Sequence, residues 1–186
     1  MPEKVLIENC SPTLAGIKTA SLVNLKWEDS AQAMREMREM NRAFGSKGLR
    51  AVPLRFRKGR TLLYLYRPDQ LQKDLMDERA QACLKKLGYP CGNPEQCVVF
   101  LAERVRQSPD FPHEIGFFLG YPPEDVIGFI EHRDEGCKCV GTWRVYGDES
   151  AARKTFRKYR KCTDVYERCW SGGRSILDLT VRGAQA

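Results

Sequence analysis

The sequence predicts a mixed α+β fold: a single compact domain in which several helices cover a small, largely antiparallel sheet. Two observations predict this class. Most segments repeat apolar residues at helical spacing, and two stretches that alternate apolar and polar residues flank the turn at Lys58 and Gly59. A chain of 186 residues can bury a full hydrophobic core. No tract rich in Gly, Ser and Pro divides it, so we expect residues 1–186 to form one domain.

The first quarter of the chain is expected to hold a strand and two helices. The apolar residues 5–7 predict a short strand. Ser11 is a preferred helix cap and Pro12 a preferred first helical residue, so a helix is expected from there to about residue 22. Apolar residues on one face predict a second helix from Asp29 to about Gly45.

A β-hairpin and a series of helices are expected to follow. The hairpin occupies residues 49–57 and 60–67, and Pro53, which has no N–H to donate, predicts an edge strand or a bulge. Caps and periodicity then predict, in order, a helix over 68–87, a helix that begins at Asn93, a short helix over 113–119, a helix from Pro122 or Pro123 to about 132, a strand over 140–146, a long basic helix from Asp148 to about 170, and a last strand over 176–181.

Composition narrows the classes of protein that fit this chain. The net charge of +7 favours an anionic partner, such as a phosphate compound, nucleic acid or an acidic protein surface. No apolar run is long enough to cross a bilayer and no secretory signal pattern opens the chain, so we expect a cytoplasmic protein that does not bind a membrane. Its eight cysteines are then expected to be reduced thiols.

Cys10 is the first candidate for a reactive group. It lies where the predicted strand ends and a helix begins, and free N–H groups at a helix start stabilise a thiolate. Thr13 would support the same turn, and Lys18, further along, could reach an anion. Packing of Cys10 as a small apolar residue is the alternative, because cysteine is among the most buried residue types.

The second candidate is the segment 111–126, FPHEIGFFLGYPPEDV, which sets one of two histidines beside carboxylates. His113 is a natural general base for a cysteine. Its neighbour Glu114 would point about 100° away on a helix, so one of the two would serve the site while the other orients or caps. A first helical turn that merely favours a carboxylate is the alternative.

Two further features have both a functional and a structural interpretation. Thiolates and imidazole can hold iron, zinc or haem, although the cysteine spacing fits structural zinc poorly and two of the thiols share a face with aromatic residues. The long basic helix is typical of a solvated surface or of a phosphate-binding stripe, and no nucleic-acid module accompanies it. The alternative metal ligands are His113, Cys137, Cys139, Cys162 and Cys169.

Three segments resemble an uncharacterised bacterial family known as a domain of unknown function. They are residues 10–18 (CSPTLAGIK), residues 111–126, and residues 143–148 (WRVYGD) together with 158–163 (KYRKCT). The resemblance spans nearly the whole chain and implies a one-domain bacterial protein, but no activity. Its motifs contain Cys10, Thr13, Lys18, His113, Glu114, Tyr121, Asp125 and Cys162.

Our hypothesis from the sequence is a thiol-dependent enzyme or redox protein. Cys10 would be the reactive thiolate, His113 the acid or base, and Glu114 or Asp125 an orienting carboxylate. One alternative is a non-catalytic protein that binds iron, zinc or haem, and another is a basic interaction or nucleic-acid-binding module. The residues expected to bind an anionic small-molecule substrate are Thr13, Lys18, Arg55, Arg67 and Tyr121.

Overall fold

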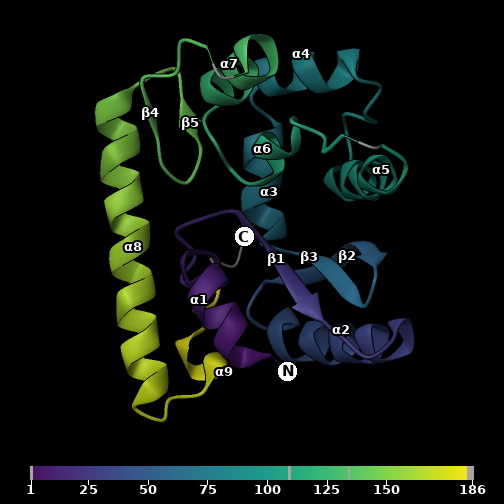
Figure 1. Ribbon diagram of the computed structural model, residues 1–186, viewed down its shortest axis with the longest axis vertical. Helices are drawn as coiled ribbons and strands as arrows, with labels where there is room; N and C mark the ends of the chain where they lie inside the picture. The colour runs from purple at the N-terminus through teal and green to yellow at the C-terminus, as the bar shows by residue number, and fades with distance from the viewer. Residues whose placement is uncertain (1, 109, 134, 184–186) are drawn as a thin grey trace.

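The computed structural model describes residues 2–108, 110–133 and 135–183, and it confirms the α+β class (Figure 1). Its elements are α1 (Glu3–Leu14), β1 (Ala20–Lys26), α2 (Ser30–Gly45), β2 (Arg50–Arg57), β3 (Arg60–Tyr66), α3 (Pro68–Leu75), α4 (Glu78–Lys86), α5 (Pro94–Gln107), α6 (Ile115–Phe118), α7 (Pro123–His132), β4 (Cys139–Val140), β5 (Arg144–Val145), α8 (Glu149–Ser171) and α9 (Ile176–Leu179).

A three-stranded antiparallel sheet in the order β1-β3-β2 forms the centre of the molecule. The predicted hairpin is confirmed as β2 and β3, and Lys58 and Gly59 turn the chain with positive φ angles of 49° and 70°. The register of β2 on β3 shifts between Pro53 and Arg55, which confirms the bulge on an edge strand. A proline at this place costs the sheet no ladder hydrogen bond.

The sheet separates two apolar clusters, and β3 contributes to both. Its residues Leu62, Tyr64 and Tyr66 face the cluster formed with α3 to α7, whereas Leu63 and Leu65 face the cluster formed with α1, α2 and α9. This alternation follows from the two-residue period of a strand, and it explains why β3 is apolar on both faces. In Figure 1 the two groups of helices lie above and below the sheet, and α8 runs along one side past both.

The N-terminal prediction was wrong. Residues 5–7 are part of the helix α1, because Leu6, Ile7, Cys10 and Leu14 line one buried helical face. Pro12 lies in the last turn of α1 instead of its first, and the chain then turns at a left-handed Gly16 into β1. A short apolar run does not by itself distinguish a buried helix face from a buried strand, which accounts for the error.

Three later boundaries also differ from the prediction. The helix expected over 68–87 is two helices, because the Asp77 carboxylate caps α4 by accepting the N–H groups of Arg79 and Ala80. The strand expected over 140–146 consists of the two-residue strands β4 and β5. The last expected strand is the helix α9, which Ser175 caps. The helix α8 begins after Asp148 as expected. No helix in the described parts of the chain is long and apolar enough to span a membrane.

Candidate functional site

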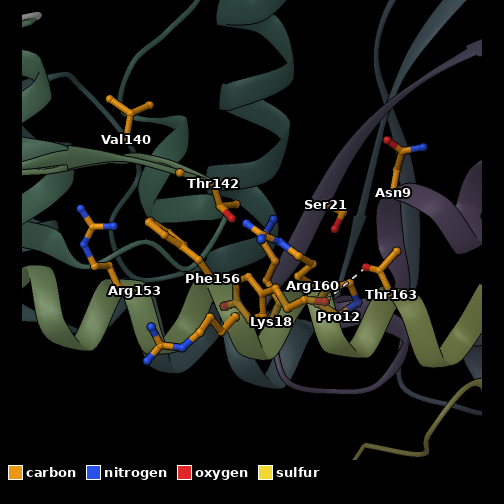
Figure 2. Close-up of a pocket in the computed structure, with 13 residues that line it drawn as sticks. Asn9, Pro12, Lys18, Ser21, Val140, Thr142, Arg153, Phe156, Arg160 and Thr163 are labelled. Carbon is orange, nitrogen blue, oxygen red and sulfur yellow. Dashed lines mark hydrogen bonds between the residues drawn. The ribbon is translucent and has the colours of Figure 1, made fainter.

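A cavity of about 490 Å³ lies between α1, the start of β1, the β4–β5 turn and α8 (Figure 2). We call it the Lys18 cavity. Every charged side chain that the structure places in its lining is cationic. In Figure 2 Lys18 and Arg160 lie near its centre with Thr142, while Arg153 lies toward the Val140 end. The lining residues are Asn9, Pro12, Lys18, Ser21, Val140, Gly141, Thr142, Arg153, Phe156, Arg157, Tyr159, Arg160 and Thr163.

Lys18 reaches the cavity because the chain folds back over the end of α1. The backbone N–H groups of Ile17 and Lys18 both donate to the Pro12 carbonyl, at 3.0 and 3.1 Å. Gly16 adopts a φ of +72°, a conformation that side chains with a Cβ rarely take. The turn ends at Thr19, directly before β1. Lys18 is therefore placed by the fixed backbone of a tight turn.

The Lys18 ammonium lies between two aromatic rings. Its Nζ atom is 5.5 Å from the ring centroid of Tyr121 and 5.9 Å from that of Tyr159. Within the described residues the ammonium has no hydrogen bond and no carboxylate partner. The side chain is half-buried, and desolvation lowers the pKa of Lys18 to about 8. The Lys18 ammonium is thus held at the cavity by contacts with aromatic rings.

Aromatic packing fixes the β4–β5 turn over this site. Trp143 stacks on Tyr121 with ring centroids 4.8 Å apart and meets Phe156 edge-on at 4.6 Å. A Cβ atom at Gly141 would come within 2.2 Å of the Phe156 ring, so this close approach requires glycine. The turn is therefore a packed wall of the cavity.

Asp125 anchors the same turn from α7. Its buried carboxylate accepts the indole N–H of Trp143 at 2.6 Å and the backbone N–H groups of Tyr146 and Gly147, each at 2.7 Å. Three donors occupy a carboxylate that the sequence suggested as a catalytic orienting group. We conclude that Asp125 positions the β4–β5 ribbon.

His113 belongs to a second, largely apolar cavity of about 260 Å³. Its ring packs edge-on against Phe129 with centroids 4.9 Å apart. Glu114 points elsewhere: its buried carboxylate accepts the Tyr89 hydroxyl at 2.9 Å and the Arg104 Nε at 2.6 Å. Burial and the nearby Glu114 raise the pKa of Tyr89. Glu114 thus joins a buried network, and within the described residues His113 has no carboxylate partner.

Cys10 is not at a helix start, so the basis for a stabilised thiolate was wrong. The residue is 0% exposed inside α1 and belongs to the apolar cluster of α1, α2 and α9. Burial raises the pKa of the Cys10 thiol to about 12, and the nearby Lys18 offsets only part of this. The structure places Cys10 in an apolar core and His113 at the second cavity, so it does not bring the two into one cavity.

The expected anion-binding residues separate into two groups. Lys18 and Tyr121 contact each other at the cavity. Arg67 is only 2% exposed, and backbone carbonyls accept its N–H groups, so these donors already have partners within the protein. Arg55 lies on the edge strand β2, outside the lining of the Lys18 cavity. Thr13 lies beneath the cavity, where its hydroxyl is 2.9 Å from that of Ser21.

A family model described as a protein of unknown function, DUF3793, matches residues 6–180. The chain belongs to this family. The match confirms the resemblance to a domain of unknown function that the sequence motifs indicated. Searches of curated proteins and of solved structures gave no match. The description of the DUF3793 family gives no activity, so the function must be argued from the site.

The alternative metal ligands of this DUF3793 chain are not gathered into one site. Over residues 2–108, 110–133 and 135–183, no group of three His, Cys, Asp or Glu side chains is placed to hold a metal ion. Cys162 and Cys169 are two turns apart on α8, where Cys169 packs against the apolar cluster of α1, α2 and α9. The ligand set proposed from the sequence for iron, zinc or haem therefore does not fit the arrangement.

The sequence did not reveal that Arg153, Arg157 and Arg160 line a cavity. Their spacing of four and three residues places them on one face of α8, which is a signal for a shared surface. The wall opposite that face comes from residues more than 130 positions earlier, and no local pattern predicts this pairing. Two separate features of the sequence did indicate the site, which are the motif that contains Lys18 and the basic helix interpreted as a phosphate-binding stripe.

Proposed function

We propose that the protein binds a small anionic molecule in the Lys18 cavity. The observation that carries the proposal is the half-buried Lys18 ammonium, which opens onto a cavity and has no carboxylate partner among the described residues. A desolvated cation costs free energy unless an opposite charge accompanies it. A bound anion would supply that charge.

The rest of the lining supports an anionic ligand. Arg153, Arg157 and Arg160 add guanidinium groups, which bind carboxylates and phosphates through paired N–H donors. Arg153 is partly neutralised by Glu149, whose carboxylate lies 2.7 Å from its Nε. These arginines and Lys18 repel one another when the cavity holds no anion, and a ligand with more than one negative charge would relieve that repulsion.

The dimensions and polar groups suit a small molecule. A cavity of about 490 Å³ falls within the range of ligand sites, and it is open to solvent on one side. Asn9, Thr142 and Thr163 add hydrogen-bonding groups around the cations. The proposal leaves Cys10 as a packed thiol beneath α1, since its burial does not favour the ionised form.

Titration calorimetry with inorganic phosphate, pyrophosphate and oxalate tests the proposal. We expect saturable binding of at least one of these anions with a stoichiometry of one. Lys18→Met should weaken it by at least about ten-fold and Arg160→Gln by roughly three- to ten-fold. Lys161→Gln is the matched control, because it removes one charge from the next position of α8, outside the lining.

Proton uptake gives a second readout that a weak surface association would not show. An anion beside Lys18 restores its charged form, so binding at pH 8 should take up protons from the buffer, and the affinity should fall as the pH rises above 8. Equal weakening by Lys161→Gln and Arg160→Gln would instead indicate diffuse attraction to the basic helix. Absence of saturable binding for all three anions would end the proposal.

A further inference from the structure

We propose that Lys18 forms an imine with a carbonyl compound that carries a carboxylate or phosphate group. The inference deepens the proposed function and rests on it, since the anionic group would be held by the arginines of the same cavity. The ligand would then be a small anionic aldehyde or ketone, for example a 2-oxo acid.

The division of cations in the lining is the first argument. Lys18 is the one primary amine that the described residues place in this cavity, and the other three cations are arginines. Guanidinium groups bind oxyanions but do not attack carbonyl carbons. In this cavity the arginines would therefore bind the anionic group of such a compound, and the Lys18 amine alone could attack its carbonyl carbon. Figure 2 shows both Arg160 and Lys18 near the centre of the cavity.

The surroundings of the amine are the second argument. Tyr121 and Tyr159 flank Nζ, and stacking of Tyr121 on Trp143 keeps that wall in place. A lysine withdrawn from solvent has the setting in which amines act as nucleophiles, because desolvation favours the neutral form. The titratable and charged groups that face it are Cys10, Tyr121, Tyr159 and the arginines of α8.

Desolvation supports the same conclusion. With the pKa of Lys18 lowered to about 8, roughly one amine in ten is neutral at pH 7, about 300-fold more than for a lysine with the ordinary value. Burial raises the pKa values of Tyr121 and Tyr159 to about 12, so both hydroxyls keep their protons when the amine loses its own. The amine is therefore the first of these groups to become a nucleophile as the pH rises.

The reaction needs no oxidant, reductant or metal. The neutral Nζ attacks the carbonyl carbon, and an amine proton passes to the carbonyl oxygen to give a carbinolamine. The C–O bond then breaks, water leaves with the second amine proton, and a C=N bond forms. The aromatic rings beside Nζ limit the access of solvent, which favours the loss of water.

Reductive trapping tests the inference. Wild-type protein is incubated at pH 7.5 with pyruvate, or with glyceraldehyde 3-phosphate, in the presence of sodium cyanoborohydride, and the adduct is located by peptide mass spectrometry. We expect one adduct, at Lys18, formed at least about ten-fold faster than at any other lysine. Whether the carboxylate or the phosphate compound reacts faster identifies the anionic group. Propanal, an aldehyde with no anionic group, should react at Lys18 more slowly than the aldehyde glyceraldehyde 3-phosphate.

Two variants complete the experiment. Lys18→Arg keeps the positive charge, so it should still bind oxalate but form no adduct in the cavity. Lys158→Arg, on α8 next to the arginines but outside the lining, should be trapped like the wild type. Oxalate binding by the wild type without an adduct at Lys18 would overturn the imine and leave the anion site standing. If the wild type shows neither oxalate binding nor trapping, both proposals are overturned together. Similar trapping rates at many lysines would also overturn the imine.

Discussion

Arg67 and Lys18 are two cations that lie close to the end of α1, yet their surroundings are opposite. Arg67 is buried and donates to the carbonyls of Thr13, Leu14 and Val181 at 2.7 to 2.8 Å. Lys18 has two aromatic rings beside it and a cavity in front of it. A cation whose donors are all taken by backbone serves to hold the chain. A cation that is desolvated without such partners is available to a ligand, which is why our proposals concern Lys18.

Replacement of Arg67 should have the largest effect on stability. Arg67→Met removes the side-chain donors to four carbonyls, which include that of Lys47 at 3.3 Å, and leaves the Thr13, Leu14 and Lys47 carbonyls with backbone N–H donors alone. We expect the free energy of unfolding to fall by about 3 kcal/mol or more, measured by urea denaturation. Arg55→Met, on the neighbouring edge strand, is the control and should change it by less than about 0.5 kcal/mol. Similar effects of the two variants would contradict the conclusion that Arg67 stabilises the fold through its hydrogen bonds to backbone carbonyls.

Replacement of Lys18 should instead raise the free energy of unfolding. Lys18→Met removes a desolvated charge and keeps an apolar chain of similar length, so the free energy of unfolding should rise by about 1 to 3 kcal/mol at pH 7. A decrease of similar size would mean that the ammonium has a stabilising partner, and it would contradict the contrast drawn between Lys18 and Arg67. Lys26→Met, at the exposed end of β1, controls for the loss of one charge.

The pH dependence of the same variant sharpens this test. The folded pKa of Lys18 lies near 8, below the ordinary value of 10.5, so the unfolded chain binds more protons between these values and stability rises with pH there. The gap between Lys18→Met and the wild type should therefore shrink by roughly 1 kcal/mol from pH 7 to pH 9. Above pH 9 the Cys10 thiol, whose pKa is raised, acts in the opposite direction. A gap that does not change with pH would contradict the lowered pKa of Lys18.

The smallest effect is expected at Glu149, which pairs with Arg153 on the exposed surface of α8. Glu149→Gln should leave the unfolding midpoint unchanged within error, because exposed ion pairs contribute little to stability. The same variant frees the Arg153 charge, so the affinity for an anion in the Lys18 cavity should increase by about two-fold. Calorimetry and thermal unfolding measure the two quantities. A weaker affinity would place the ligand away from Arg153.

The sequence predicted elements well where a local signal defines them. The capped helices α2, α5 and α8 and the hairpin of β2 and β3 have such signals, and all are present. It failed at α1, where a short apolar run resembles a strand, and at α9, where the pattern of residues 176–181 also resembles one. Both segments pack against the apolar cluster of α1, α2 and α9. Their secondary structure therefore depends on contacts with residues distant in the sequence, which a local pattern does not show.

The same distinction applies to the site. Lys18 and Tyr121 were predicted from sequence motifs, and the structure brings them together. Arg67 was assigned to a substrate because a sequence shows a charge but not the carbonyls that satisfy it. Cys10 was placed at a helix start because α1 was assigned wrongly, and its burial followed from the true helix. Charge and residue type were visible in the sequence, whereas partners and burial required the fold.

The bond between Arg67 and Val181 has a consequence for biosynthesis. One wall of the Lys18 cavity comes from residues 9–21 and the other from residues 140–163, and the Arg67 side chain completes its bonds only with residue 181. Contacts between such distant parts of a chain form late in folding. A ribosome would have to release the chain as far as Thr163 before these walls could meet. Until then Lys18 would be a solvated lysine like any other, and its lowered pKa would appear only when residues 140–163 had joined the cavity.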